Sequence, residues 1–198
     1  MTVVGLTGGL GSGKGMVGGF FRSLGCYVID TDALYHTMTA SDSPCSRELI
    51  CRFGQDISNA DGGICRPKLA PIVFGDSVAL ADLNSIAHKY VRAECERIIA
   101  SVRGYDIIVI DAPQLFEAGM QDICDTTVCV VCEMEKRISR ICKRDGITRD
   151  KAIARINAQY SDEYFSSVCD FVINNDSDIA RLLAKTKRVL DKIKEINR

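Results

Sequence analysis

The stretch that decides the fold of this 198-residue chain is residues 2–15, TVVGLTGGLGSGKG. Residues 2–7 form a short apolar run typical of a buried strand, and a helical pattern begins at Lys14. Between them, residues 8–14 fit G-x-x-x-x-G-K, which indicates a phosphate-binding loop in this strand–helix context. Glycines let the backbone wrap around phosphate groups, and the helix N-terminus adds its positive end. The candidate nucleotide-binding residues here are Gly9, Leu10, Gly11, Ser12, Gly13, Lys14, Gly15 and Met16.

Four further apolar runs predict the rest of a sheet. They are rich in Val and Ile and nearly continuous, as buried parallel strands are. The runs cover residues 26–30, 106–111, 126–132 and 170–174. Helical patterns alternate with them, so we expect an α/β fold: a three-layer sandwich around a five-stranded parallel sheet.

Two stretches between the strands are too long for a single crossover helix. Residues 33–104 predict a helical insertion, with a long helix near 77–102, and residues 134–168 predict a second helical region. The core then consists of residues 1–32, 105–133 and 169–198, closed by a helix near 178–196. We expect one domain made of this core, the insertion 33–104 and a lid at 134–168.

Composition excludes several classes of protein. The net charge of −1 and pI of about 6.1 argue against a dedicated nucleic-acid binder, and no apolar run approaches the ~20 residues of a membrane span. The N-terminus lacks a signal-peptide pattern, so we expect a cytoplasmic protein. The ten cysteines then read as reduced core residues. Cys129 and Cys132 have C-x-x-C spacing, but in one strand they would face opposite sides and share no metal.

Carboxylates follow two of the predicted strands and are candidates for phosphoryl chemistry. Asp111 ends the strand at 106–111 and either assists Mg²⁺, directly or through water, or is structural. The residue after Lys14 is Gly15, where phosphate loops usually place a Mg²⁺-binding hydroxyl. Asp30 and Asp32 follow the strand at 26–30. The residues alone leave open whether Asp32 is a general base or a helix N-cap.

The predicted lid contains three regularly spaced arginines. Arg137, Arg140 and Arg144 are spaced three and four residues apart, so one helix face can carry them all. Arginines on a mobile segment suit a lid that closes over phosphates. A solvated charged face with acidic partners is the alternative, and Arg155 and Gln159 are either structural or ligand-facing.

A series of segments along nearly the whole chain resembles the dephospho-CoA kinase family. In order, they are GLTGGLGSGKG (5–15), VIDTD (28–32), RPKLAPIVF (66–74), LNSIAHKYVR (83–92), IDAPQLFEAG (110–119), RISRICKRDGIT (137–148), ARINAQ (154–159) and DFVINND (170–176). The resemblance implies a P-loop NTPase fold and ATP- and Mg²⁺-dependent phosphorylation of the ribose 3′-hydroxyl of 3′-dephospho-CoA. This is the final step of coenzyme A biosynthesis.

The resemblance also implies roles for individual residues. Asp32 falls at the position of the family's general base, and Lys14 would stabilise charge on the phosphoryl group. Arg140 and Arg144 fall at the positions of lid arginines that contact the ATP phosphates. Asn174 and Asn175 fall in the loop near the adenine of ATP. The substrate-binding positions that it implies are Asp32, His88, Arg92, Leu115 and Glu117. Gly15 and Met16 depart from the usual pair after the lysine, as do Lys89 and Gln114 in their own segments.

Other functions remain as alternatives. A nucleoside monophosphate kinase shares the loop and lid, but it fits segments 66–74, 83–92 and 110–119 less well. A GTPase would need an N-K-x-D segment, which does not occur. A P-loop module that binds ATP without turnover is a third reading. We expect small-molecule partners, no nucleic acid, no membrane, and a monomer or small homo-oligomer.

Overall fold

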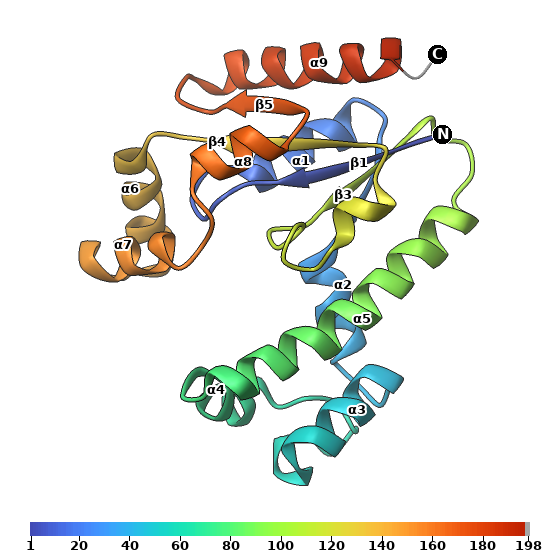
Figure 1. Ribbon diagram of the computed structural model, residues 1–198, viewed down its shortest axis with the longest axis vertical. Coiled ribbons are helices and arrows are strands. Elements are labelled where there is room, and N and C mark those ends of the chain that lie inside the picture. The colour runs from blue at the N-terminus through green and yellow to red at the C-terminus, as the bar shows by residue number, and fades with distance from the viewer. Residues whose placement is uncertain (197–198) are drawn as a thin grey trace. The chain divides into compact units, whose positions relative to one another are not determined.

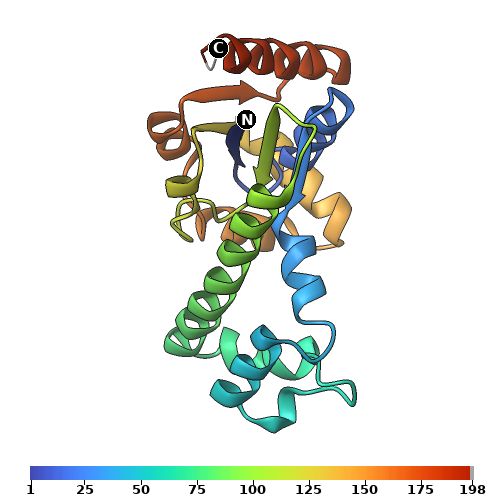
Figure 2. The same cartoon turned by 90° about the vertical axis from the view of Figure 1, so that its right-hand side faces the viewer.

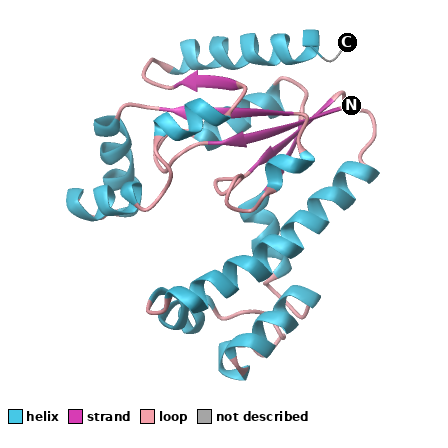
Figure 3. Ribbon diagram, in the orientation of Figure 1, coloured by secondary structure: helices cyan, strands magenta, loops and turns pink. Residues whose placement is uncertain are grey.

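The computed structural model describes residues 1–196, which form a parallel sheet and a set of helices (Figures 1 and 3). The strands are β1 (Thr2–Thr7), β2 (Tyr27–Asp30), β3 (Ile107–Asp111), β4 (Thr126–Val131) and β5 (Phe171–Asn174). The helices are α1 (Lys14–Ser23), α2 (Thr31–Met38), α3 (Pro44–Phe53), α4 (Arg66–Phe74), α5 (Ser77–Ser101), α6 (Met134–Asp145), α7 (Arg149–Asn157), α8 (Asp162–Val168) and α9 (Ile179–Ile196). Short 3-10 helices cover Gln55–Ile57 and Met120–Ile123.

The sheet has the strand order β2-β3-β1-β4-β5, with β1 in the middle. β1 pairs in parallel with β3 on one side and β4 on the other, so that Gly5 lies opposite both Ile110 and Thr127. All six residues of β1 are buried, which explains its unbroken apolar sequence. The phosphate-loop sequence leaves the carboxyl end of this central strand, where open α/β sheets bind their ligands.

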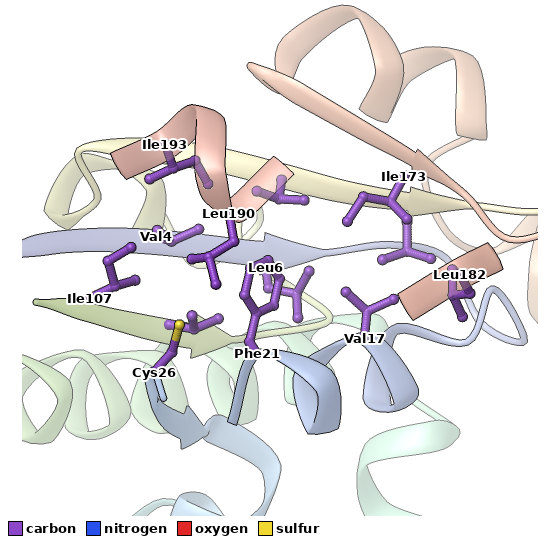
Figure 4. Close-up of a cluster of buried hydrophobic side chains, with 13 residues drawn as sticks. Val4, Leu6, Val17, Phe21, Cys26, Ile107, Ile173, Leu182, Leu190 and Ile193 are labelled. Carbon is purple, nitrogen blue, oxygen red and sulfur yellow. The ribbon is translucent and has the colours of Figure 1, made fainter. Parts of the chain in front are cut away.

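One face of the sheet is covered by α1 and α9. Their apolar sides meet the side chains of the strands in a single core cluster, drawn in Figure 4. Val17 and Phe21 of α1 and Leu182 and Leu190 of α9 are at most 2% exposed. Burial of each such side chain contributes about 1.5–3 kcal/mol, so this layer fixes α1 against β1.

The opposite face is covered by α8 and by the segment that follows β3. In Figure 1, α8 lies over β4. Phe165 of α8 is 1% exposed, and Leu115 is completely buried against Gly5. A Cβ at Gly5 would lie 2.8 Å from Leu115 Cδ2, so the glycine makes room for this layer. Helices therefore sandwich the sheet, which confirms the predicted three-layer α/β fold.

Residues Asp30–Ser101 form a compact unit of their own. Its core joins α3, α4 and the amino-terminal half of α5, the long green helix of Figure 2, around Leu49, Ile57, Leu69 and Val73. The other compact unit consists of Met1–Ile29 and Val102–Arg198. The helical unit begins at Asp30 and ends at Ser101, whereas the sequence placed its limits at 33 and 104.

The predicted strands agree with the structure to within a residue at each end. The end of β4 changes one argument, however, because the strand stops at Val131 and Cys132 lies beyond it. The premise that Cys129 and Cys132 share a strand was therefore wrong, and Cys132 Sγ instead donates to Asn175 O at 3.3 Å. Burial raises the pKa of the Cys132 thiol to about 11, and all ten cysteines are free.

None of the helices within residues 1–196 is long and apolar enough to cross a membrane.

Candidate active site

The phosphate loop, residues 8–13, connects β1 to α1 with unsatisfied backbone donors. Gly13 is the N-cap of α1 and has φ 93°, a left-handed conformation that favours glycine, and it provides no side chain to cap the helix. Within residues 1–196, no hydrogen-bond acceptor is found for the N–H groups of Gly11, Gly13, Lys14 and Gly15. Free amides at a helix N-terminus form an anion-binding site.

The carbonyl groups of the same loop are held by side chains from α6 and from the end of β5. Arg140 Nη1 donates to Gly11 O at 3.1 Å and to Ser12 O at 3.3 Å. Asn175 Nδ2 donates to Ser12 O at 2.7 Å, and Arg140 Nη2 donates to Asn175 O at 3.3 Å. Arg140 and Asn175 thus form one network around the loop, and Asn175 is 4% exposed. With its carbonyls occupied, the loop leaves its amides available for an anion.

Lys14 and Asp111 form an ion pair beside the loop. Lys14 Nζ donates to Asp111 Oδ1, and the two side chains are 16% and 9% exposed. Asp111 is the last residue of β3, and its second oxygen lies where a side chain at Gly18 would be, 2.8 Å from the Cβ position. Gly18 of α1 therefore gives this carboxylate its place next to the loop.

The residues at the loop fit a magnesium ion that is held partly by a nucleotide. Mg²⁺ in kinases keeps several waters and binds one or two carboxylates together with substrate phosphates. Asp111 supplies one carboxylate at the right edge of the sheet, and Gly15 supplies no hydroxyl. No cluster of three or more acidic, His or Cys side chains suitable for a metal occurs in residues 1–196. The donor set fits Mg²⁺ brought in with phosphates, and Asp111 is the carboxylate that would contact it.

The other arginine expected at the phosphates, Arg144, has a different setting. Its Nε donates to the neighbouring Asp145 Oδ1 at 2.6 Å, and its side chain is 61% exposed. The hydrogen bond that Arg144 donates to the Asp145 carboxylate holds the pKa of Arg144 above its usual value. Arg140 and Arg144 therefore have different surroundings in this structure: Arg140 contacts the phosphate loop, and Arg144 lies at the surface of α6.

Two predicted substrate contacts follow β3. Leu115 is completely buried, and its side chain fills the space above Gly5. Leu115 has a core role: the whole residue is buried, and its carbonyl accepts from Met120 N at 2.9 Å. Glu117, two residues further on, is exposed.

The remaining predicted residues belong to the helical unit Asp30–Ser101. Asp32 is exposed in the first turn of α2, where the N-cap is Asp30, whose Oδ1 accepts from Ala33 N at 2.9 Å. The reading of Asp32 as an N-cap is therefore wrong. On α5, Arg92 Nε donates to Glu96 Oε1 at 3.1 Å, and His88 is half-buried four residues earlier.

Two residues that the sequence left as undecided also contact the phosphate loop. Arg137 Nε donates to Leu10 O at 2.9 Å, and Gln159 Oε1 accepts from Leu10 N at 2.7 Å. The spacing of the arginines in the sequence did not indicate that Arg137 rather than Arg144 would contact the loop. Gly18 was missed altogether, although a glycine in the interior of a helix is itself a signal of close approach.

This sheet order and loop make the protein a P-loop protein of the kinase type. The family model described as dephospho-CoA kinase matches residues 2–181, and the chain belongs to this family. The dephospho-CoA kinase of Carboxydothermus hydrogenoformans is 37% identical over 196 residues, covering 98% of this chain and 95% of that protein.

Solved structures agree with the fold. The protein TT1252 from Thermus thermophilus superimposes with a TM-score of 0.82 at 29% identity, over 96% of this chain and 97% of that one. A dephospho-CoA kinase from Campylobacter jejuni gives a TM-score of 0.72 at 23% identity, over 99% and 98% of the two chains. At that identity, the second likeness supports the fold alone.

Proposed function

We propose that the protein transfers the γ-phosphoryl group of ATP to the ribose 3′-hydroxyl of 3′-dephospho-CoA, forming CoA and ADP. Membership of the dephospho-CoA kinase family over residues 2–181 carries this proposal. The phosphate loop supports it, because four free backbone amides and Lys14 provide a site for a triphosphate. The reaction would be the final step of coenzyme A biosynthesis.

In the proposed reaction, Asp32 is the general base. Its carboxylate accepts the proton of the 3′-hydroxyl as the ribose oxygen forms a bond to the γ-phosphorus. The bond from that phosphorus to the bridging β,γ-oxygen breaks in the same displacement, and ADP leaves with the bond's electron pair. The proton resides on Asp32 until it is released to water.

The phosphate loop stabilises the charge that this displacement develops. The amides of Gly11, Gly13 and Gly15 donate to phosphate oxygens without reorganisation, and Lys14 adds a positive charge. Arg140 supports the loop from outside, and Arg144 is available to the phosphates once it leaves Asp145. Bound with ATP, Mg²⁺ would neutralise phosphate charge, and Asp111 would hold it directly or through water.

The helical unit Asp30–Ser101 is the proposed binding site of the acceptor. His88 and Arg92 lie one turn apart on α5 and would supply polar contacts for a large phosphorylated substrate. Glu117, in the other compact unit, is proposed as a further substrate-binding residue. Asn175 Nδ2 donates to Ser12 O and so holds the loop after β5 against the phosphate loop, which supports a role of that loop in binding the adenine of ATP. The ten free thiols suit a reducing compartment, which supports a cytoplasmic location.

ADP release measured with dephospho-CoA, with AMP and without acceptor tests this function. We expect release to depend on dephospho-CoA and to fall by about 10²–10⁴ in Asp32→Asn, with ATP binding retained. Asp30→Asn is the matched control, because asparagine caps a helix as well as aspartate does. This control keeps wild-type turnover if Asp32 is the base.

Two results contradict the proposed reaction, and a third contradicts the role of Asp32. Faster turnover with AMP would make the protein a nucleoside monophosphate kinase. ATP binding without acceptor-dependent ADP release would make it a nucleotide-binding module. An equal loss in Asp30→Asn and Asp32→Asn would place the defect in α2 rather than in a base.

A further inference from the structure

Leu10, in the middle of the phosphate loop, is held through both of its backbone groups. Its N–H donates to Gln159 Oε1, and its carbonyl accepts from Arg137 Nε. The Leu10 side chain also packs against the apolar cluster of α6 and α7 that contains Ile138 and Ile156. Leu10 is thus joined to the helical region 134–168 by two hydrogen bonds and an apolar contact, in addition to the hydrogen bonds that Arg140 donates to Gly11 O and Ser12 O.

Arg137 extends this connection to α8 and to the end of β4. It is 4% exposed, and its Nη1 donates to Asp162 Oδ1 at 2.8 Å. Asp162 Oδ2 in turn accepts from Cys132 N at 3.2 Å. A buried guanidinium is stable only with its charge compensated, so Asp162 is required for Arg137 to stay in place.

Arg137 also occupies the space next to the loop glycines. A Cβ at Gly9 would lie 2.3 Å from Arg137 Nη2 and 3.0 Å from its Cζ. A Cβ at Gly11 would lie 2.9 Å from the Arg137 carbonyl oxygen. The shape of the loop and the position of Arg137 therefore determine each other.

We propose that Arg137, Asp162 and Gln159 form a loop anchor that holds the phosphate loop in its anion-binding shape before a nucleotide arrives. The anchor residues are positioning residues, since they act through Leu10 and Gly9 and leave the free amides to the ligand. This inference rests on the proposed function only in taking a triphosphate as the ligand of the loop. The loop anchor also fixes the start of α6 against the phosphate loop. Any closing motion of the lid is then restricted to the residues that follow the start of α6.

The anchor predicts a loss of affinity that does not depend on the base of the nucleotide. Arg137→Gln removes the guanidinium contacts to Leu10 and Asp162. We expect the Kd for ATP and the Kd for inorganic tripolyphosphate to rise by the same factor, about tenfold, in calorimetric titrations. Arg137→Lys keeps the charge but not the fork of donors. We expect its Kd for each ligand to lie between that of the wild type and that of Arg137→Gln.

Arg149→Gln is the matched control for this measurement. Arg149 pairs with Glu135 in the same helical region, but the two side chains are 56% and 70% exposed. The control should bind both ligands as the wild type does. The anchor is refuted if Arg137→Gln lowers the melting temperature without changing either Kd, or weakens ATP but not tripolyphosphate.

A double-variant cycle tests whether Arg137 acts through the loop. Gly9→Ala cannot be accommodated while Arg137 stays in place, so it should displace the guanidinium and weaken binding as Arg137→Gln does. In the Gly9→Ala, Arg137→Gln double variant, the loss should be no larger than that of one change. A loss equal to the product of the two single losses would show independent effects and overturn the proposal.

Gln159 provides a second route if Arg137→Gln does not fold. Gln159→Leu removes the acceptor for Leu10 N, whereas Gln159→Glu retains it. We expect weaker tripolyphosphate binding in the first and near-wild-type binding in the second, and equal binding in both would contradict the anchor. All these titrations omit the acceptor, so a wild type that binds ATP but does not phosphorylate dephospho-CoA would refute the proposed function alone.

Discussion

The glycines between Gly13 and Gly19 lie in two different environments. In the crowded one, a Cβ at Gly13 would lie 2.2 Å from Asn175 Nδ2, and a Cβ at Gly18 would lie 2.8 Å from Asp111 Oδ2. In the open one, Gly15 and Gly19 have no neighbouring atom within 4 Å of the Cβ position. The same residue type thus allows close approach at two positions and leaves open space at two others.

This difference separates glycines that the site requires from glycines that it tolerates. Gly13 and Gly18 admit Asn175 and Asp111 to the loop, so their lack of a side chain is part of the site. Gly15 stands where a hydroxyl usually assists Mg²⁺, and packing does not exclude one there. The missing hydroxyl is therefore a chemical feature of this chain and not a steric necessity.

Among the glycine substitutions, the largest expected effect is that of Gly13→Ala. Alanine would be strained at φ 93° and would also displace the Asn175 amide, so we expect ATP to bind about 100-fold more weakly. Calorimetric titration measures this. Gly104→Ala is the control, because Gly104 has φ 81° with open space around it. An equal loss of ATP affinity in the control would attribute the effect to strain in general.

Gly18→Ala should have the next largest effect. The added methyl group pushes the Asp111 carboxylate from its position and weakens the pair with Lys14. We expect kcat to fall about tenfold and the Mg²⁺ concentration for half-maximal rate to rise, since the carboxylate is the protein's proposed Mg²⁺ contact. Steady-state kinetics over a Mg²⁺ series checks this. An unchanged Mg²⁺ concentration for half-maximal rate would mean that Asp111 does not hold the metal.

A smaller effect is expected from Gly15→Ser. The side chain enters open space and places a hydroxyl next to Lys14. We expect the fold to be unchanged and Mg²⁺ to bind the ATP complex about threefold more tightly, as measured by calorimetric titration of Mg²⁺ into protein with ATP. Weaker Mg²⁺ binding with an intact fold would mean that the open space is needed by the nucleotide.

The smallest effect is that of Gly19→Ala, which matches Gly18→Ala one residue further along α1. Gly19 is exposed in the helix interior, so alanine should stabilise the protein by about 0.5–1 kcal/mol through helix propensity alone. Thermal denaturation should show a melting temperature about 2–3 °C higher, with unchanged kinetics. A lower melting temperature would contradict the open environment of Gly19.

Local patterns in the sequence were sufficient for the sheet and for the phosphate loop. Buried parallel strands are short apolar runs, and the loop is a fixed spacing of glycines and a lysine, so each is visible within a few residues. Asp111 was found for the same reason, since it ends such a run. These features need no knowledge of distant partners.

Contacts between distant residues could not be predicted in this way. Arg137 and Arg144 look equivalent by spacing, yet one is buried on a loop carbonyl 127 residues away and the other is exposed. The difference arises because Leu10 packs on one face of α6, which no local pattern reports. Asp32 was the cap that the sequence suggested, but α2 begins at Thr31, which makes Asp30 the cap.

The central place of β1 has a consequence for synthesis on the ribosome. β1 is made before its partners β3 and β4, which begin at Ile107 and Thr126. At about 5–20 residues per second, the nascent chain carries this apolar strand for about 5–20 s before β3 exists. During this time both edges of β1 are unpaired, and a strand with every residue destined for the interior is prone to association with other chains. The helical unit Asp30–Ser101, with its contiguous sequence, is complete before then, so we expect it to fold first on the ribosome.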